Sequence, residues 1–360
     1  MRLGALCRWV RDLDIVSGFA QQMGQAGPKR TALQEQLLVV MDSILRATGP
    51  IDYSIEDNKA VGEGPVILRK EWNLWAESMP KRNTYDSVLD RSIFESVPKD
   101  IKSKFRIIET TPGVERKPPN HHPAILYASH DNSISTPSEA PHTTFHTHPI
   151  VPNLHLFKDV LTVQECSEII AAGEAVGFLP DAPIREEGEE NSILAHNFYW
   201  VADEEFCSRI WKRVEPFVPA KVRGKQARGL NRRFRVYRYV PGAEYRAHID
   251  GAWPPSGIDP VKDTYIYDNS PPDAKQSSLY TFLIYLNDEF EGGETTFFLP
   301  SAREGSMNAY PVRPIQGAAA LFPHGETYDT ILHEGTGVRQ GDRPSAKYVI
   351  RTEVLYDVDT

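Results

Sequence analysis

Residues 234–250 read FRVYRYVPGAEYRAHID, and they decide how the rest of the chain is interpreted. Alternating side chains predict a strand, the Pro241-Gly242 pair predicts a turn, and a second strand should end on His248-Ile249-Asp250. Because side chains two apart on a strand point to the same face, His248 and Asp250 should project together. An imidazole and a carboxylate on one face supply part of a 2-His-1-carboxylate iron site, which keeps further positions open.

A third ligand must come from elsewhere, because a His-x-Asp pair alone is a common pattern. We expect it to be His333, in ILHEGTGVRQG, which follows Asp250 by 83 residues (333 − 250) that include several predicted strands. A barrel brings such distant strands face to face. The competing segment His324-Gly325-Glu326 also pairs an imidazole with a carboxylate. It ranks below His333 because its glycine and the preceding Phe322-Pro323 predict a turn.

The strand KYVIRTEVLY near the C-terminus supplies two candidate cations. A dicarboxylate that chelates iron at one end needs a cation for its far carboxylate, and a buried cation is costly without its anion. Lys347 and Arg351 lie on one face of this strand by parity, and chemistry alone does not decide between them. The alternative is that both are ordinary solvent-facing strand charges.

Composition restricts the class of protein. The chain has 360 residues, of which 40% are hydrophobic and 25% charged, as in a globular protein with one large domain or two ordinary ones. Its net charge of -9 argues against nucleic acid or an anionic membrane as the main partner. The cysteines Cys7, Cys166 and Cys207 have no metal-ligand spacing and fit a reducing compartment.

The location expected from the sequence is intracellular, most simply the cytoplasm. No apolar run reaches the length of a transmembrane helix. The opening stretch MRLGALCRWVRDLDIV is too interrupted by charges for a secretory signal, although it leaves a weak organellar signal open.

Residues 1–110 are predicted to be mostly helical and to carry no chemistry. One helix is expected to begin at a capping box of Thr31 and Gln34 and to end at Gly49-Pro50, and a weaker helix is expected over residues 84–97. We interpret this region as a packing or partner-binding extension of unknown role.

Residues 111–153 have the Pro-, Ser- and Thr-rich composition that is typical of a linker or surface loop. The segment also holds a group of histidines, namely His121, His122, His130, His142, His146 and His148. A metal-binding cluster is conceivable, but exposed loop histidines are favoured because no periodic scaffold fixes their geometry.

Residues 154–360 are predicted to form one mostly β domain with flanking helices. Helices should begin at Thr162, in a capping box with Glu165, and at Asp203. Short strands separated by Gly and Pro turns are then expected over residues 233–239, 279–287, 294–298, 317–322 and 347–356. Helices followed by many short strands predict a β-sandwich or barrel backed by helices.

Residues 251–277, which we call the long loop, are polar and directly follow the predicted metal strand. Loops of this length in compact domains often act as functional lids. Trp253 could line a pocket mouth, or it could be an ordinary tryptophan packed under the loop.

With these residues assembled, the region from about residue 153 to residue 356 resembles the 2-oxoglutarate- and Fe(II)-dependent oxygenases of the prolyl 4-hydroxylase type. The resemblance rests on pieces in the family's order, namely YVPGAEYRAHID, FLIYLND, EGGETTFF, GAAALFPHG, LHEG and KYVIRTEVLY. It covers a little over half of the chain and implies a double-stranded β-helix (jelly-roll) core with a helical N-terminal extension.

The resemblance also implies roles for single residues. It implies that the iron ligands are His248, Asp250 and His333. It implies that the 2-oxoglutarate site consists of Lys347, which holds the distal carboxylate, with Tyr239, Tyr285 and Tyr245 as pocket walls. The implied cofactors are Fe(II) and the co-substrate 2-oxoglutarate, with ascorbate as an optional addition.

The sequence departs from the family's pattern in its spacing. Lys347 follows His333 by 14 residues (347 − 333), more than the family usually has, so Arg343 or Arg351 could share the role of Lys347. The long loop also exceeds what a minimal member needs, so the substrate is the least transferable property.

The function implied is hydroxylation of an unactivated C–H with O2, most simply in a peptidyl proline, with succinate and CO2 as co-products. A second hypothesis keeps this chemistry but acts on a free amino acid or another small molecule. A third is a non-catalytic jelly-roll binding module. The oligomeric state and the hydroxylated position stay open.

Overall fold

The computed structural model describes residues 31–48, 50–52, 66–75, 83–95, 97–117, 119–184, 195–243, 245–325, 327 and 329–358. The α-helices are α3 (Ala32–Thr48), α4 (Thr84–Leu89), α5 (Val163–Val176) and α6 (Glu204–Val214), and the 3-10 helices are η1 (Ser92–Glu95), η2 (Ile101–Lys104) and η3 (Gly113–Glu115). The earlier strands are β1 (Val66–Leu68), β2 (Phe105–Thr111), β3 (Ala124–Ser129), β4 (Thr144–Thr147), β5 (His155–Lys158), β6 (His196–Val201), β7 (Lys221–Val222), β8 (Lys225–Leu230) and β9 (Arg233–Tyr239). The later strands are β10 (Tyr245–His248), β11 (Gly257–Ile258), β12 (Tyr265–Ile266), β13 (Gln276–Tyr285), β14 (Thr295–Pro300), β15 (Met307–Val312), β16 (Ala319–Pro323), β17 (Leu332–Gly335) and β18 (Lys347–Asp357).

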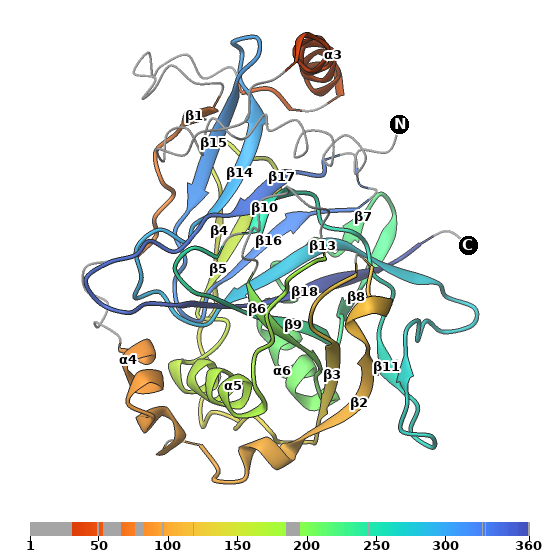
Figure 1. Ribbon diagram of the computed structural model, residues 1–360. Helices are drawn as coiled ribbons and strands as arrows, with labels where there is room; N and C mark the ends of the chain where they lie inside the picture. The colour runs from red at the N-terminus through yellow and green to blue at the C-terminus, as the bar shows by residue number, and fades with distance from the viewer. Residues whose placement is uncertain are drawn as a thin grey trace.

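Two sheets form the body of the protein (Figure 1). The major sheet has the order β2-β3-β6-β9-β18-β13-β16-β5-β4, with β8 paired to β18. The minor sheet has the order β1-β15-β14-β17-β10. Neighbours such as β10 and β17 are distant in sequence, as expected when a chain crosses between the sheets of a jelly roll. The predicted mostly β fold with a jelly-roll core is therefore confirmed.

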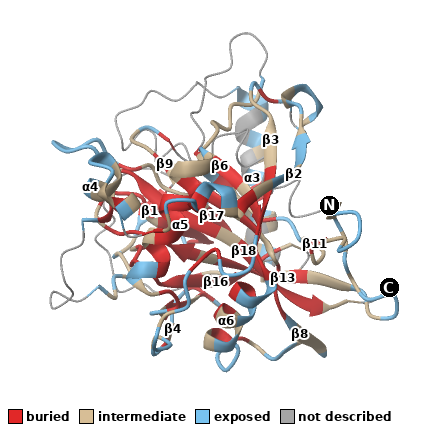
Figure 2. Cartoon of the chain, turned by 90° about the horizontal axis from the view of Figure 1, so that it is seen from below, coloured by how far each residue is buried: buried red, intermediate tan, exposed pale blue. Residues whose placement is uncertain are grey.

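The major sheet is buried on both faces, which explains why its central strands read as nearly continuous apolar runs. On β13, Phe282 and Ile284 point into one apolar cluster, whereas Tyr285 points into another. On β18, Tyr348 and Ile350 share the first cluster and Val349 lies in the second. Figure 2 shows this buried interior running through the central strands.

Helices α5 and α6 cover the outer face of the major sheet (Figure 1). The predicted capping box at the start of α5 is confirmed, since Thr162 accepts from the Glu165 backbone N–H and Glu165 accepts from that of Thr162. Asp203 caps α6 by accepting from the Phe206 N–H at 2.9 Å, also as predicted. These local signals fix where the helices begin, and the apolar cluster fixes where they pack.

The N-terminal region differs from the mostly helical expectation. Helix α3 forms as predicted, but β1 pairs with β15, and β2 joins the major sheet through β3. The helix expected over residues 84–97 divides into α4 and η1, because Arg91 between them has a left-handed φ of 68°. The described part of residues 1–110 is thus packed onto both sheets.

The interpretation of residues 111–153 as linker or surface loop does not hold for β3 and β4. Strand β3 pairs with β6, and β4 pairs with β5, so both belong to the major sheet. His148 is buried, and its Nδ1 accepts from the backbone N–H of Val151 at 2.9 Å. Propensity missed β3, one of whose pairing partners, β6, lies far along the chain, and it missed β4 although its partner β5 is the next strand in sequence.

The long loop contains its own small hairpin, β11 with β12. Its tip contacts the major sheet where Asp263 and Arg106 of β2 form an ion pair at 2.6 Å. No helix within the described part of the chain is long and apolar enough to cross a membrane.

Candidate metal centre

His248, Asp250 and His333 come together at the end of β10. One ligand atom from each residue lies within 4.8 Å of the others, and no other such group of three is found within the described ranges. The register of the minor sheet explains the approach, because His248 and His333 are direct cross-strand partners of β10 and β17. The structure thereby brings together the three residues proposed from the sequence.

Asp250 lies just beyond the strand that was expected to contain it. β10 ends at His248, and the Asp250 carbonyl accepts a hydrogen bond from Gly325 N–H at 3.0 Å. The prediction of the strand end was therefore wrong by two residues, although the side chains still converge. Convergence follows from this tertiary hydrogen bond and from the register, and strand parity alone would not have produced it.

Both imidazoles present Nε2 to the carboxylate of Asp250. The Nδ1 of His248 lies 2.7 Å from the Arg246 carbonyl, and the Nδ1 of His333 lies 3.2 Å from the Ile331 carbonyl. A carbonyl only accepts, so each Nδ1 carries a proton, and the neutral form of each ring has its free lone pair on Nε2. The two Nε2 atoms lie 3.4 and 3.6 Å from the nearer Asp250 oxygens.

The protonation states suit a metal ion. Burial raises the pKa of Asp250, but Arg351 and the two histidines outweigh that effect and hold it well below the usual value. Burial and the nearby His248 lower the pKa of His333 to about 3. An ionised carboxylate with neutral imidazoles is the donor set of the facial triad, so these residues fit a divalent transition metal such as Fe(II).

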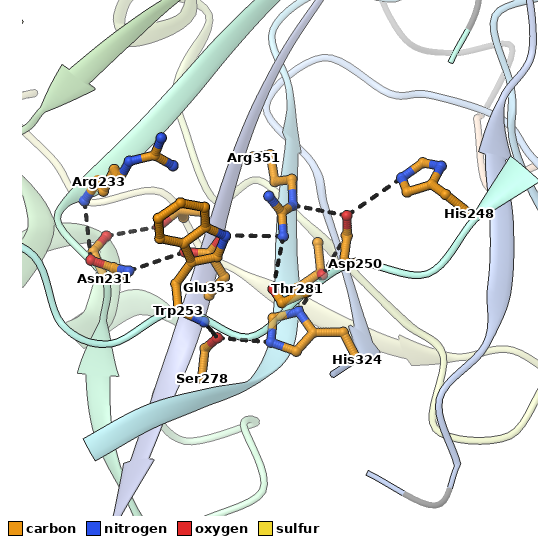
Figure 3. A network of polar contacts seen from close by, with 12 residues as sticks. Asn231, Arg233, His248, Asp250, Trp253, Ser278, Thr281, His324, Arg351 and Glu353 are labelled. Carbon is orange, nitrogen blue, oxygen red and sulfur yellow. Dashed lines mark hydrogen bonds and ion pairs between the residues drawn. The ribbon is translucent and has the colours of Figure 1, made fainter. Parts of the chain in front are cut away.

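His324, the competing candidate from the sequence, is not placed to bind the same ion. Its Nε2 lies 2.8 Å from the Ser278 hydroxyl, and its Nδ1 lies 2.8 Å from the Thr281 hydroxyl. Both ring nitrogens are therefore occupied by hydrogen bonds. The Thr281 hydroxyl in turn donates to Asp250 Oδ2 at 2.7 Å, as Figure 3 shows.

Lys347 is buried between the sheets with an incompletely neutralised charge. Its Nζ donates to the Gly293 carbonyl at 2.7 Å and lies 5.3 and 5.7 Å from the ring centroids of Tyr239 and Tyr285. Burial lowers its pKa to about 7, although Glu294 acts in the opposite direction. Within the described residues it forms no ion pair with a carboxylate, so this position favours an anion.

The tyrosines expected as pocket walls line the same interior. Tyr239 is the cross-strand partner of Lys347, and the Tyr285 hydroxyl donates to Thr295 at 2.8 Å. Tyr245 stacks edge-on against His248 with ring centroids 4.0 Å apart. Tyr245 therefore lies nearer the metal centre, and Tyr239 and Tyr285 lie beside the lysine.

Arg351 shares the inward face of β18 with Lys347 but has other partners. Its Nε lies 3.1 Å from Asp250 Oδ1 and its Nη2 lies 3.4 Å from Glu353, so it is held by two carboxylates. The first contact is an ion pair without hydrogen-bond alignment, because this Nε makes no hydrogen bond. Arg343 is exposed in the preceding loop. Lys347 is therefore the better-placed cation for an added anion.

Trp253 packs at the base of the long loop. The Arg233 guanidinium lies 4.2 Å from its ring centroid, and the Tyr267 ring lies 5.7 Å away. Its contacts match the second sequence interpretation, a tryptophan packed within the loop. Sequence reasoning missed Thr281 because a threonine within a strand carries no local signal of function.

Comparisons with known proteins concern mainly the second half of the chain. Residues 234–351 match the family model described as the 2OG-Fe(II) oxygenase superfamily. No curated protein matches this chain. A solved structure of viral collagen prolyl hydroxylase from Paramecium Bursaria Chlorella virus-1, as a 2OG complex, is 20% identical, covers 57% of this chain and 97% of that chain, and has a TM-score of 0.33.

Two further solved structures are similar at lower identity. An oxidoreductase of the 2OG-Fe(II) oxygenase family from Burkholderia pseudomallei is 14% identical, with 56% of this chain and 84% of that chain covered and a TM-score of 0.35. The carbocyclase SnoK from nogalamycin biosynthesis is 14% identical, with 57% of this chain and 79% of that chain covered and a TM-score of 0.33.

Proposed function

We propose that this protein, a 2-oxoglutarate- and Fe(II)-dependent dioxygenase by its family match over residues 234–351, hydroxylates an unactivated C–H of a peptidyl proline. The balanced reaction is R–H + O2 + 2-oxoglutarate giving R–OH + succinate + CO2. Two observations together support it best. Ligand atoms of His248, Asp250 and His333 lie within 4.8 Å of one another, and Lys347 is buried without a carboxylate partner among the described residues.

In this proposal each residue has a definite task. His248, Asp250 and His333 hold Fe(II), which supplies the activation of O2 when bound. Lys347 binds the distal carboxylate of 2-oxoglutarate, and Tyr239 and Tyr285 exclude water around it. The backbone carbonyls at Nδ1 of both histidines keep their Nε2 atoms directed at the metal.

The substrate class rests on how the centre meets solvent. The side chain of His248 is 23% exposed, whereas that of His333 is 6% exposed, so one side of the triad is open. An open side suits a peptide segment better than a small molecule enclosed on all sides. Hydroxylation of a free amino acid is the second candidate, in which the long loop would close that side.

We further propose that the chemistry resides in residues 154–360, because every residue of the candidate site lies there. The described part of residues 1–110 would then supply support, as β1 and β2 do. Ascorbate is proposed as an optional reductant. An intracellular location is supported by the small number of cysteines, three in 360 residues, which fits a reducing compartment.

The decisive test is anaerobic titration with Fe(II) and 2-oxoglutarate, followed by the weak visible charge-transfer band. We expect the band in the parent protein and its loss in His248→Ala. Succinate release with a proline-rich peptide, compared with free amino acids, then separates the two substrate classes. A parent protein without the band would exclude the oxygenase proposal and favour a non-catalytic binding module. Turnover with free amino acids only would exclude the peptide substrate.

A further inference from the structure

A buried line of hydrogen bonds joins the base of the long loop to a candidate metal ligand. The backbone N–H of Trp253 donates to Ser278 Oγ at 2.9 Å, and Ser278 Oγ lies 2.8 Å from His324 Nε2. His324 Nδ1 lies 2.8 Å from Thr281 Oγ1, which donates to Asp250 Oδ2 at 2.7 Å. We call these five residues the polar chain, and Figure 3 shows all of them.

The polar chain has one consistent direction. An ionised Asp250 only accepts, so the Thr281 hydroxyl donates its hydrogen bond to the carboxylate. Thr281 must therefore accept a hydrogen bond from His324. His324 then carries its proton on Nδ1, and its Nε2 accepts from Ser278. Ser278 finally accepts from the Trp253 N–H, which is a fixed donor. Every group is used once, and reversing any single bond would leave a buried group unsatisfied.

Burial makes this arrangement stiff. Ser278 and Thr281 are fully buried, and His324 is 1% exposed. Burial lowers the pKa of His324 to about 4, which agrees with a neutral ring that donates from one nitrogen only. Water cannot readily replace these bonds, so the orientation of the carboxylate depends on the chain.

The polar chain also holds the two ends of the long loop together. Ser278 N–H donates back to the Trp253 carbonyl at 2.9 Å, so these residues bond reciprocally where the loop leaves and rejoins the sheet. A second arm reaches the other oxygen of Asp250. The side-chain amide of Asn231 donates to the loop backbone just after Trp253, and it also donates to Glu353 Oε2 at 3.2 Å. Arg351 lies beside both Glu353 and Asp250.

We propose that Thr281 and His324 are positioning residues that hold the Asp250 carboxylate in one orientation and couple it to the base of the long loop. The proposal rests on the proposed function, because it requires a metal at His248, Asp250 and His333. Metal binding then stabilises the closed base of the loop, and by reciprocity a closed base strengthens metal binding. A substrate that contacts the loop would thereby act on the metal centre without touching it.

The first test measures Co(II) binding, with Co(II) as a spectroscopic substitute for Fe(II). Thr281→Val keeps the side-chain shape and removes the hydroxyl, and we expect Co(II) affinity to fall by about 10- to 100-fold. The visible d–d spectrum should change with it. Thr281→Ser restores the hydroxyl and should restore both affinity and spectrum. A purely structural threonine would leave the spectrum unchanged.

A matched control is Thr143→Val. Thr143 is also a buried threonine with a single donated bond, to the Asp159 carbonyl at 3.0 Å, but it lies outside the polar chain. We expect it to lower stability without changing the Co(II) spectrum. If Thr281→Val does not fold, Ser278→Ala carries the same test, because it interrupts the polar chain three hydrogen bonds from Asp250.

The second test measures coupling to the loop by hydrogen exchange with Zn(II). Zn(II) should slow exchange of the backbone N–H groups around Trp253 and Ser278 in the parent protein, and this slowing should be lost in Ser278→Ala. Unchanged affinity and spectrum in Thr281→Val, or slowing that persists in Ser278→Ala, would overturn the inference. Absence of Co(II) binding in the parent, or binding unaffected by His248→Ala, would instead overturn the proposed function.

Discussion

Lys347 shows how a single side chain can be kept at a cost in stability. Its ammonium is buried beside one carbonyl and two aromatic rings, and burial lowers its pKa to about 7. A buried cation without an anion is unfavourable, which agrees with the proposed role of Lys347 in binding an anion. Asp250 contrasts with it, because Arg351 and Thr281 already compensate its charge.

We expect Lys347→Met to stabilise the protein in the absence of ligand at pH 7. The pKa of Lys347 is lowered from 10.5 to about 7, so the stability of the parent falls as pH drops from 10.5 to 7. Methionine removes this cost, and a gain of about 1–4 kcal/mol is the usual range for such replacements. Urea unfolding at pH 7 and pH 10 checks it, since the gain should shrink at the higher pH. If the variant were less stable than the parent at pH 7, burial of the Lys347 ammonium would not be destabilising.

The affinity for 2-oxoglutarate should fall as pH rises above 7. The anion requires the charged ammonium, whose pKa is lowered by burial first, raised by Glu294 and lowered by Arg313. Binding must therefore take up a proton, and affinity should weaken by up to about tenfold per pH unit. Anaerobic calorimetry with Mn(II) between pH 7 and 9 measures this, in two buffers to count protons. Lys347→Arg stays charged and should remove the dependence; an equal dependence in that variant would assign it to another group.

At the scale of elements, the start of α5 illustrates a local signal that the tertiary structure reuses. Glu165 belongs to the capping box with Thr162 and also pairs with Arg213 of α6 at 2.9 Å. The same carboxylate therefore starts one helix and joins it to the next. The pair β10 and β17 shows the opposite case, because neither short strand carries a strong signal and only their pairing gives them a register.

Thr162→Ala should destabilise the protein by about 1 kcal/mol, because it removes one half of the capping box. Thr162→Ser keeps the accepting oxygen and should lose much less. Chemical denaturation of both variants measures the difference. Since α5 lies on the outer face of the major sheet, the Co(II) spectrum should stay unchanged in both. A spectral change would mean that this helix influences the metal centre.

At the scale of the whole molecule, the two halves of the chain contribute strands to the same sheet and residues to the same core. β3 completes the major sheet beside β6, and β4 pairs with β5. Apolar residues of the first half, among them Ile93 and Phe105, belong to the same core cluster as α5 and α6. Figure 1 shows strands of the first half, among them β2 and β3, as part of the sheets.

A chain that begins at residue 154 should therefore not fold cooperatively. It would expose the edges of β5 and β6 and remove part of the core beneath α5. We expect binding of a hydrophobic dye, loss of a sharp thermal transition and loss of Co(II) affinity. Circular dichroism and dye fluorescence, compared with the full chain, check this. A cooperative transition with parental Co(II) affinity would show that residues 154–360 are an independent domain.

Much of the molecule was readable from local pattern. The capping box at Thr162, the alternation of β9 and the apolar runs of β13 and β18 each reflect short-range physics, namely helix-end hydrogen bonds and side-chain burial. The candidate ligands were also readable, because imidazoles and a carboxylate in a strand-rich context indicate metal chemistry. Helix 84–97 was misjudged because Arg91 has a left-handed backbone. The linker at 111–153 was misjudged in part because β3 pairs with the distant β6, which its local composition does not indicate.

The tertiary structure decided which candidates act together. Register between β10 and β17 places His333 opposite His248, and no spacing in the chain encodes that register. Lys347 and Arg351 share a strand face, but only the folded structure distinguishes them, because Arg351 forms an ion pair with Asp250. His324, a ligand candidate in the sequence, is instead connected to Asp250 by hydrogen bonds through Thr281. Residue types set what chemistry is available, whereas long-range hydrogen bonding and burial set which residue performs it.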